Sequence, residues 1–530
     1  MLHITVQGRG SCESRPGDTI LEALIRAALP GAALTGNGII LSAPCGGRGI
    51  CGKCRITLLK GTVELRDTKV IPKPGDSFSA CRGTTLSDIT IELPEEEIIA
   101  ETITDLSADT KPKRIEKPGR KKVLHAGIGV DIGTTTVQAE LIDLGSGKSL
   151  ETITALNDQR SFGADVMSRI NAARNGQSGE LSAVLNRQIE GILQHCLYKW
   201  NLSGIEQATI SGNTTMLHFF CGADPSGMGV VPFTPVFLEE RHFPGKELNL
   251  SVGQIGVLPG ISAFVGADIV SGLAFLDILN RKKDSLLVDI GTNGEIALWK
   301  KAEQRLLCCS TAAGPCFAGA EISCGMGALP GAINRISIND KPVSAGNIFN
   351  CGPLVYSTLG NSMPRGICGA GLIDAIAALK QLSVIDETGA LTDEYIETGF
   401  PLAEGLTISQ KDIRRFQLAK SAICSGITVL CKRAGLNPAK LDAVYIAGGL
   451  GFYIDIKNAV ATGLLPPEFT ETLPGKIAVC GNLSLKGAVQ SLIESAFLQR
   501  CKKIIAHSNI VELAADADFS EAFTENMLFP

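Results

Sequence analysis

The sequence predicts a multidomain protein of mixed class, in which a small β-rich α+β module precedes a long α/β region. Its 530 residues are enough for about three domains at roughly 100–200 residues each. Hydrophobic residues make up 45% of the chain and charged residues 19%, a globular composition that excludes wholesale disorder. The pentapeptide Val130–Thr134 recurs as Val288–Thr292, 158 positions later. Each copy follows an apolar strand and opens a turn, which suggests a duplicated α/β unit.

Composition and charge exclude several classes of protein. With 49 Lys+Arg against 54 Asp+Glu the net charge is −5, so the basic excess of a general nucleic-acid binder is absent. The N-terminus has no basic segment followed by an apolar one, and no run of about 18 apolar residues occurs. We therefore expect no signal peptide, no membrane span and a cytoplasmic location with reduced thiols. There, clustered members of the 17 cysteines point to metal or redox chemistry.

Residues 1–94 have the pattern of a small β-rich module. Alternating apolar residues predict strands, and helical spacing predicts one helix with Asp18 as its N-cap. A loop rich in glycine and cysteine, residues 45–54, lies between that helix and the next strand. The expected elements are strands at His3–Gln7, Arg55–Leu59 and Asp88–Leu93 and a helix at Thr19–Ala28.

Residues 95–124 differ in character from the segments on either side. Three glutamates open this stretch, basic residues and two prolines close it, and few large apolar residues lie between. We expect a flexible charged linker, with a solvated loop packed on a domain as the alternative. A nucleic-acid patch is disfavoured because the aromatic residues that stack bases are missing.

From residue 125 to the end, short apolar strands alternate with helical stretches. We expect a first lobe at residues 125–284 and a second lobe with a C-terminal tail at residues 285–530. The expected helices include Leu181–Trp200, Gly369–Leu382 and Ile413–Ala434.

The loop at residues 45–54 carries three closely spaced cysteines, and a fourth follows 27 positions after the third. Four thiolates hold a 2Fe–2S cluster, and three of them must converge from one tightly curled loop. The glycines of the loop permit that curl and let backbone N–H groups point at the anionic cluster. Zinc is the alternative, although zinc usually prefers two C-x2-C pairs and this segment has one. The candidate cluster ligands are Cys45, Cys51, Cys54 and Cys81.

Because of the spacing of these four cysteines, residues 1–94 resemble a ferredoxin-type domain, and the resemblance implies a β-grasp fold. Plant-type ferredoxins separate the first two cysteines by four residues. Here five residues separate Cys45 from Cys51, a spacing closer to adrenodoxin-like members. That departure bears on the sub-family and the reduction potential, and it leaves the expected cluster type unchanged.

Two copies of an acid–Gly–Thr turn and a later glycine turn have the chemistry of a nucleotide site. In each copy an aspartate ends a strand, and the N–H groups and hydroxyls of the turn can bind phosphate oxygens. The carboxylate can hold Mg²⁺ through water, because magnesium dehydrates reluctantly. The strand Val444–Ala447 runs into a glycine turn, against whose bare backbone adenine and ribose can lie. The candidate ATP and Mg²⁺ residues are Asp131, Gly133, Thr134, Thr135, Thr136, Asp289, Gly291, Thr292, Asn293, Gly448, Gly449 and Gly451.

These three turns, in this order, resemble the phosphate-1, phosphate-2 and adenosine motifs of the acetate kinase–sugar kinase–Hsp70–actin (ASKHA) superfamily. The resemblance implies two ribonuclease H-like lobes with ATP in the cleft between them. The P-loop pattern, the other common ATP-binding solution, does not occur in the sequence. Phe264–Gly272 resembles the first connecting helix, and its Asp268 is a candidate to orient or activate the attacking water. The alternative for Asp268 is a helix N-terminal acid satisfied by backbone N–H groups.

A ferredoxin-type module, a linker and an ASKHA-type ATPase on one chain resemble the reductive activators of corrinoid proteins. Four further segments match signatures of that family: Ser211–Met216, Thr311–Met326, Gly366–Ile373 and Met527–Pro530. The segment Thr311–Met326 either faces the partner protein or packs in the core. The resemblance covers nearly the whole chain. This sequence departs from the family in one respect, because its first phosphate motif follows the linker almost at once. Some members of the family have an extra domain at that place. The difference bears on how the partner protein docks.

The resemblance implies an ATP-hydrolysing activator that passes one electron from the 2Fe–2S cluster to a corrinoid protein and returns inactive Co(II) to Co(I) for methyl transfer. The Co(II)/Co(I) couple lies below common ferredoxin donors, and for one electron about 59 mV costs about 1.4 kcal/mol. Binding or hydrolysis of ATP would close that gap through lobe closure. The implied partners are a corrinoid (cobalamin-binding) protein and a low-potential electron donor, and relatives suggest a homodimer.

Two other functions remain open on the sequence. A small-molecule kinase with an appended ferredoxin domain predicts a phosphorylated product and no corrinoid partner. A ferredoxin-type electron carrier without ATP turnover is disfavoured, because Asp131, Asp289 and Gly448–Gly449 are all present. Activators of 2-hydroxyacyl-CoA dehydratases share the ATPase fold but lack an N-terminal ferredoxin. The other cysteines show no ligand spacing, and burial is the expected reason for most of them.

Overall fold

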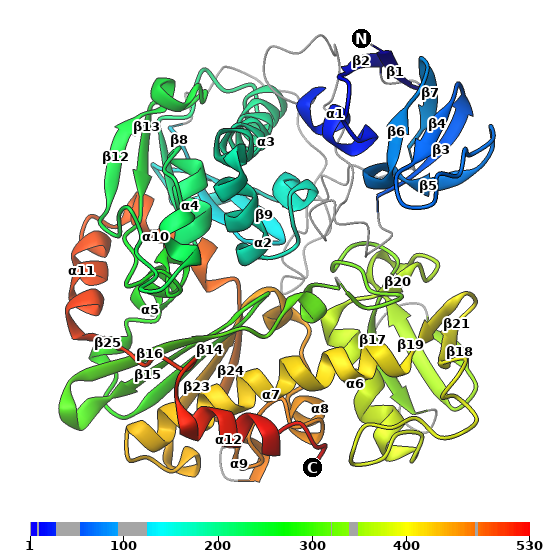
Figure 1. Ribbon diagram of the computed structural model, residues 1–530. Coiled ribbons are helices and arrows are strands. Elements are labelled where there is room, and N and C mark those ends of the chain that lie inside the picture. The colour runs from blue at the N-terminus through cyan, green and yellow to red at the C-terminus, as the bar shows by residue number, and fades with distance from the viewer. Residues whose placement is uncertain are drawn as a thin grey trace. The chain divides into compact units, whose positions relative to one another are not determined.

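The structure is a computed structural model that describes residues 2–7, 10–27, 54–93, 125–319, 321–338, 348–471 and 475–530. Contacts within the chain divide it into two compact units, whose helices and strands are labelled in Figure 1. The first unit comprises residues 1–259 and 488–495, and the second comprises residues 260–487 and 496–530. Within the described ranges, no helix has both the length and the apolar character that crossing a membrane requires. The expected linker at residues 95–124 lies outside the described residues.

The N-terminal part of the first unit is a five-stranded sheet with one helix. Strand β1 pairs antiparallel with β2 and parallel with β7, and the sheet continues from β7 through β3 to β5. Helix α1 buries Ile20, Leu21 and Leu24 in the core of this module. The arrangement is the expected β-grasp. Its elements are β1 (Leu2–Val6), β2 (Gly10–Ser14), α1 (Ile20–Ala27), β3 (Arg55–Lys60), β4 (Val63–Leu65), β5 (Ser77–Ser79), β6 (Gly83–Thr85) and β7 (Ile89–Glu92).

Helix α1 has Thr19 as its N-cap, so the expectation of Asp18 was wrong by one residue. The N–H of Glu22 donates to Thr19 Oγ1 (3.1 Å), and the N–H of Thr19 donates to Glu22 Oε2 (2.7 Å). This is the reciprocal capping box that a Thr-x-x-Glu sequence can form. Asp18 instead accepts a hydrogen bond from the N–H of Arg15 (2.7 Å) and so stabilises the preceding turn.

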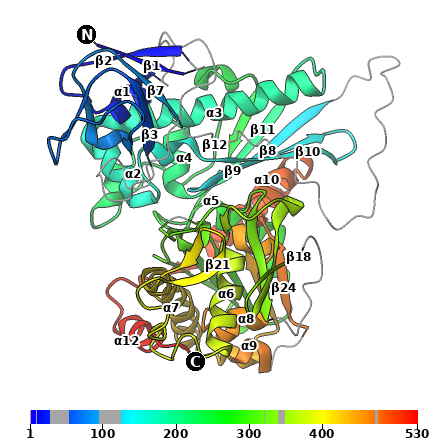
Figure 2. The ribbon, with the colours of Figure 1, turned by 90° about the vertical axis from the view of Figure 1, so that its right-hand side faces the viewer.

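Beyond that module, the first unit holds a six-stranded sheet in the order β10-β9-β8-β11-β13-β12. Strands β8, β9 and β10 form an antiparallel meander, and β11 and β13 add on in parallel beside β8. Helix α3 runs along one face of this sheet and buries an apolar stripe at helical spacing (Figure 2). The elements are β8 (Ala126–Ile132), β9 (Thr136–Asp143), β10 (Lys148–Leu156), α2 (Val166–Ala172), α3 (Ser178–Lys199), β11 (Gln207–Gly212), α4 (Thr214–Phe220), β12 (Arg241–Pro244) and β13 (Gln254–Val257).

The second unit holds another six-stranded sheet, in the order β24-β23-β14-β15-β16-β25. Again the first three strands form an antiparallel meander, and the next two add on in parallel beside the first. Both sheets thus have the strand order of a ribonuclease H-like lobe, which confirms the predicted fold class and duplication. The strands are β14 (Ser285–Ile290), β15 (Gly294–Lys300), β16 (Arg305–Thr311), β23 (Ala443–Ala447), β24 (Ile477–Gly481) and β25 (Ser508–Ile510).

The second unit also carries two small sheets, β18-β19-β17-β20 and β21-β22, and most of the helices. Each predicted helix of the α/β region is present as α3, α6 or α7, and α12 lies along α7 (Figure 1). The strands are β17 (Ala332–Ile338), β18 (Ile348–Cys351), β19 (Leu354–Thr358), β20 (Gly366–Ile367), β21 (Phe400–Ala403) and β22 (Leu406–Ile408). The helices are α5 (Ala267–Phe275), α6 (Gly369–Gln381), α7 (Gln410–Arg433), α8 (Ile456–Ala461), α9 (Glu468–Glu471), α10 (Leu483–Ile493), which crosses from the second unit to the first, α11 (Phe497–His507) and α12 (Ala517–Glu525).

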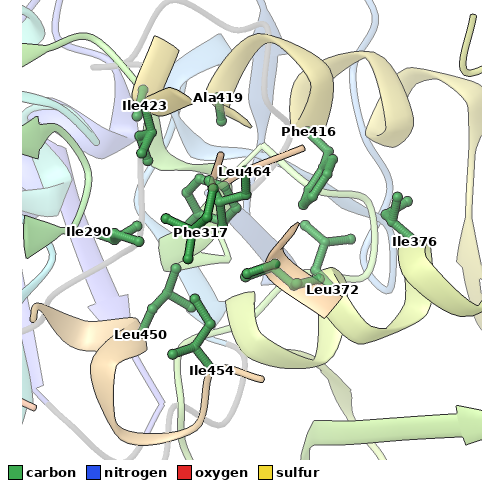
Figure 3. Close-up of a cluster of buried hydrophobic side chains, with 14 of the residues drawn as sticks. Ile290, Phe317, Leu372, Ile376, Phe416, Ala419, Ile423, Leu450, Ile454 and Leu464 are labelled. Carbon is green, nitrogen blue, oxygen red and sulfur yellow. The ribbon is translucent and has the colours of Figure 1, made fainter. Parts of the chain in front are cut away.

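The core of the second unit anchors two of its candidate nucleotide turns (Figure 3). Ile290 follows Asp289 directly, Leu450 belongs to the glycine turn, and both side chains are buried in one cluster with Phe317 and Phe416. Burial of one such side chain stabilises the fold by about 1.5–3 kcal/mol. The two turns are therefore fixed from beneath by apolar packing.

Candidate functional site

Two of the four expected cluster ligands lie together at the start of β3. Cys54 directly precedes β3, Cys81 lies in the short helix that follows β5, and both side chains are buried. Their sulfurs share a hydrogen bond of 3.3 Å, which lowers the pKa of the Cys54 thiol to about 6. The N–H of Ala80 donates to Cys54 O (2.8 Å) and fixes the two segments side by side. Cys45 and Cys51 lie outside the described residues.

The first acid–Gly–Thr turn joins β8 to β9. Asp131 is the last residue but one of β8, and the N–H of Gly133 donates to Thr136 O (2.9 Å) to close the turn. A Cβ at Gly133 would lie 2.7 Å from that same oxygen, so the turn requires glycine. Thr134 is buried, and Asp131, Thr135 and Thr136 are half-buried. The predicted residues of the first phosphate motif therefore lie together on one turn.

Three side chains from distant parts of the first unit hold this turn. Asn157 Nδ2 donates to Gly133 O (2.8 Å), and Arg169 Nη2 donates to Thr134 O (2.6 Å). Asn213 Nδ2 donates to Thr134 Oγ1 (3.0 Å), while Asn213 Oδ1 caps helix α4. The conformation of the turn is thus set by the buried Asn157 and Arg169 and the half-buried Asn213 as well as by its own residues.

The second acid–Gly–Thr turn joins β14 to β15 and is one residue shorter. The N–H of Gly291 donates to Asn293 O (2.9 Å), whereas the first turn closes between residues three apart. Asp289 lies directly opposite Glu295 on the paired antiparallel strands. Thr292 is buried and Gly291 and Asn293 belong to the same turn, so the predicted residues of the second motif also lie together.

Three carboxyl groups gather beside the second turn. Glu295 is 7% exposed, and its pKa is raised well above the ordinary value, first by burial and then by the charges of Asp268 and Asp289. Ser310 Oγ donates to Glu295 Oε1 (3.4 Å). Asp268 lies in the first turn of α5, where its Oδ1 accepts from the N–H of Ile269 (2.9 Å). Asp268 is therefore both a helix N-terminal acid bonded to backbone and a neighbour of the second phosphate motif.

The glycine turn after β23 packs directly against the second acid–Gly–Thr turn. Strands β14 and β23 are parallel neighbours in which Asp289 pairs with Ala447. Gly448 has a φ of 92°, and a Cβ there would lie 2.5 Å from Asp289 Oδ1, so this position requires glycine. A Cβ at Gly449 would meet no described atom within 4 Å, which leaves its backbone open for a ligand. The second and third predicted motifs are thus adjacent in one unit.

The remaining cysteines among the described residues are mainly buried thiols. Cys308 and Cys309 are neighbours on β16 and face opposite sides of the sheet. Burial raises the pKa of the Cys308 thiol to about 12 and raises that of Cys316 further. Neutral buried thiols are inert, which favours a packing role for them. Phe317 is buried beside Cys316 in the core, and this favours packing for much of that segment too.

Asn157, Arg169 and Glu295 were not predicted from the sequence as residues of the site. Glu295 had a readable signal, because it follows the second motif on the strand that must pair with Asp289. The sequence around Asn157 and Arg169 carries no such signal. Asn157 donates to a backbone carbonyl 24 positions away, and Arg169 donates to one 35 positions away.

The fold and these turns define the class of protein. A β-grasp module with a buried cysteine pair precedes two ribonuclease H-like sheets, each with an acid–Gly–Thr turn after its first strand. This is an ASKHA-type ATPase fold with a ferredoxin-type module at its N-terminus. A family model described as "C-terminal domain of RACo the ASKHA domain" matches residues 283–530, and a "RACo middle region" model matches residues 126–281.

Known proteins identify the family within this class. The chain is 32% identical over 434 residues to "Corrinoid activation enzyme RamQ" of Eubacterium limosum, covering 76% of this chain and 70% of that protein. It is 28% identical over 409 residues to the "[Co(II) methylated amine-specific corrinoid protein] reductase" of Methanosarcina barkeri, covering 72% of this chain and 73% of that protein. The solved "Reductive activator for corrinoid,iron-sulfur protein" matches with a TM-score of 0.69 and 26% identity, over 100% of this chain and 98% of that one. The chain belongs to the RACo family of corrinoid-protein reductive activators.

Proposed function

We propose that this protein activates a corrinoid protein by reducing its cobalt from Co(II) to Co(I) with one electron, driven by ATP. The match over the whole length of a reductive activator carries this proposal. The two relatives support it, because their names describe corrinoid activation and reduction of a Co(II) corrinoid protein. One electron leaves the N-terminal module and reduces the cobalt, and a low-potential donor replaces it.

The N-terminal module fits a 2Fe–2S cluster. Cys54 and Cys81 are buried 3.3 Å apart, and the lowered pKa of Cys54 favours the thiolate, which is the form that binds iron. With Cys45 and Cys51 they would complete the four-thiolate set. When bound, the cluster supplies one-electron chemistry. The chain holds the thiolates in place through the backbone hydrogen bond between Ala80 and Cys54.

The ATP-type fold and its three turns support nucleotide binding. The turn at residues 133–136 would bind phosphate oxygens through its N–H groups and hydroxyls. The open backbone at Gly449 would face the adenosine, and Gly448 lets that turn approach Asp289. The proposed ATP residues are those the sequence indicated: Asp131, Gly133, Thr134, Thr135, Thr136, Asp289, Gly291, Thr292, Asn293, Gly448, Gly449 and Gly451.

The carboxyl groups beside the second turn fit Mg²⁺ held through its own water molecules. In the parts of the chain that the structure describes, no three acidic, histidine or cysteine groups are placed to ligate a metal ion directly. Magnesium keeps several waters, so hydrogen bonds from those waters to Asp289 and Glu295 suit it. When bound, Mg²⁺ neutralises phosphate charge. Asp268 would orient the attacking water from the first turn of α5.

Anaerobic visible absorbance tests the proposed function. The reduced protein is mixed with a Co(II) corrinoid protein, with and without Mg·ATP, and the Co(I) band is followed. We expect a band that needs both ATP and the cluster. Cys81→Ser should lose both the cluster absorbance and the Co(I) band, whereas Cys351→Ser, a partly exposed cysteine on β18, should keep both.

The same experiment separates the alternatives. A Co(I) band that does not need ATP would point to a simple electron carrier. A phosphorylated small molecule formed without any corrinoid protein would point to a kinase with an appended ferredoxin domain. An ATP-dependent band together with cluster oxidation supports the activator.

A further inference from the structure

A fully buried arginine lies behind the first phosphate turn. Arg169 of α2 is 0% exposed, and it donates to Thr134 O (2.6 Å), Gly163 O (3.0 Å) and Gln159 Oε1 (3.3 Å). It also donates to the sulfur of Met216 (3.3 Å). Within the described ranges every one of these partners is neutral, and none is a carboxylate.

Asp165 is the carboxylate whose charge acts on Arg169, and its side chain also caps helix α2. Asp165 is the N-cap of α2 and accepts a hydrogen bond from the N–H of Ser168 (2.8 Å). Burial lowers the pKa of Arg169 to about 9, with the charge of Asp165 opposing that shift. A buried charge without a counter-charge is costly, and proteins usually pair it or neutralise it. Arg169 therefore has the environment of a cation whose counter-charge arrives with a ligand.

The hydrogen bonds of the turn show on which side that ligand would bind. In a planar trans peptide the C=O and the following N–H point in opposite directions. The carbonyls of Gly133 and Thr134 point at Asn157 Nδ2 and Arg169 Nη2, so the N–H groups of Thr134 and Thr135 point the other way. Successive N–H groups aimed at one side form an anion-binding nest, and a guanidinium on the opposite carbonyl strengthens such donors by polarising the peptide.

We propose that Arg169 is a positioning residue of the phosphate site, whose buried charge orients the residue 133–135 peptides and is balanced by the polyphosphate of the bound nucleotide. The proposal rests on the nucleotide function proposed above and assigns that site a residue which never touches the ligand. On this proposal, Arg169 is the residue that makes the site bind a polyphosphate such as ATP more tightly than a monophosphate such as AMP. A purely structural arginine would support the turn without affecting that preference.

The test measures dissociation constants for Mg·ATP and for AMP by calorimetry on the full-length protein. Arg169→Met removes the charge, Arg169→Lys keeps it, and Arg241→Met on β12 is the matched loss of a charge that pairs with Glu239 (3.5 Å). We expect Arg169→Met to weaken ATP binding about tenfold and AMP binding by less than about threefold. Arg169→Lys should keep the ATP-to-AMP ratio within about threefold of wild type, and Arg241→Met should leave both constants unchanged.

Two results would overturn the proposal. One is a folded Arg169→Met variant that keeps the wild-type ratio of ATP to AMP affinity, and the other is an Arg169→Lys variant that loses as much as Arg169→Met. If Arg169→Met does not fold, inorganic tripolyphosphate binding by Arg169→Lys decides: retention within about threefold supports the role of the charge, and a tenfold loss in a folded protein contradicts it. A wild-type protein that binds no ATP would instead refute the proposed function itself.

Discussion

The two acid–Gly–Thr turns share five residues but lie in opposite electrostatic surroundings. Opposite Asp131 on the paired strand is Gln138, and buried Arg169 donates to the turn that follows. Opposite Asp289 is Glu295, a buried carboxyl whose pKa is raised by burial and by the charges of Asp268 and Asp289. Identical pentapeptides therefore fix similar backbone turns, while residues outside the motif decide the charge around each one.

This difference suggests a division of labour between the two copies. The first turn, backed by a cation and by amide donors, suits an anion such as a phosphate group. The second turn, backed by carboxyl groups, suits a hydrated cation such as magnesium. The two copies of the motif therefore differ in the sign of the charge that each would accept, although the pentapeptide alone makes them look equivalent.

The largest expected effect is loss of activity in Asp289→Asn. If the carboxyl groups beside the second turn bind the waters of Mg²⁺, this change should lower the ATP-dependent rate of Co(I) formation by about a hundredfold. Removal of one key electrostatic group from an active site has an effect of this size. Asp131→Asn should lower that rate by about tenfold, because Arg169 and the turn amides remain. The rate is read from the Co(I) absorbance band at saturating ATP.

Cluster absorbance is the control for both aspartate variants, and it should match that of the wild type. A larger loss in Asp131→Asn than in Asp289→Asn would reverse the assignment of anion and cation sides. Equal losses would mean that the two turns contribute alike to activity, and the proposed division into an anion side and a cation side would be wrong.

A buried carboxyl group in the second unit predicts how the stability of that unit depends on pH. Asp374 of α6 is buried, and burial raises its pKa from 3.8 to about 6, although Asn458 Nδ2 donates to it (2.7 Å) and Arg335 lies 3.8 Å away. Because the folded-state pKa is raised, the stability that Asp374 contributes is present below about pH 4 and is lost as the pH rises to about 6. A shift of about two units corresponds to at most about 3 kcal/mol.

Asp374→Asn should remove that pH dependence. Calorimetric unfolding at pH 4, 5, 6 and 7 should show the transition of the second unit falling less steeply with pH in the variant than in the wild type. Asp393→Asn, at an exposed position in the same unit, is the matched control and should follow the wild type. A variant slope equal to the wild-type slope would mean that Asp374 stays ionised in the folded protein.

The sequence allowed prediction of what depends on local chemistry and on repetition. The acid–Gly–Thr turns, the glycine turn and the paired sheets follow from short patterns, and the structure bears them out as one ribonuclease H-like topology used twice. The cap of α1 shows the limit of local patterns. Asp18 and Thr19 are both good cap residues, and only the reciprocal bond with Glu22 selects Thr19.

The charge around each turn could not be predicted because it depends on tertiary contacts. Arg169 lies in a helix 35 positions from the carbonyl that it supports, and an arginine in a helical stretch normally reads as a surface residue. Asn157 follows β10 and is fully buried, yet an asparagine at such a place reads as a turn residue. Cys45 and Cys51, two of the four predicted cluster ligands, lie outside the described residues.

The smallest expected effect comes from exchanging the residues that lie opposite the two aspartates. This exchange tests most directly whether those residues decide the charge around each turn. Like charges directly opposite each other on antiparallel strands destabilise a sheet by about 0.2–1 kcal/mol. In EDTA, at a pH above the raised pKa of Glu295 so that its carboxyl is ionised, Glu295→Gln should therefore raise the unfolding temperature by about 2 °C, and Gln138→Glu should lower it by a similar amount. Adding Mg²⁺ with ATP should stabilise Glu295→Gln less than the wild type, because one acceptor of the metal's waters has lost its charge. Lower stability of Glu295→Gln in EDTA would show instead that Glu295 serves mainly as the acceptor for Ser310, and the acidic character of the second turn would then be incidental to the metal.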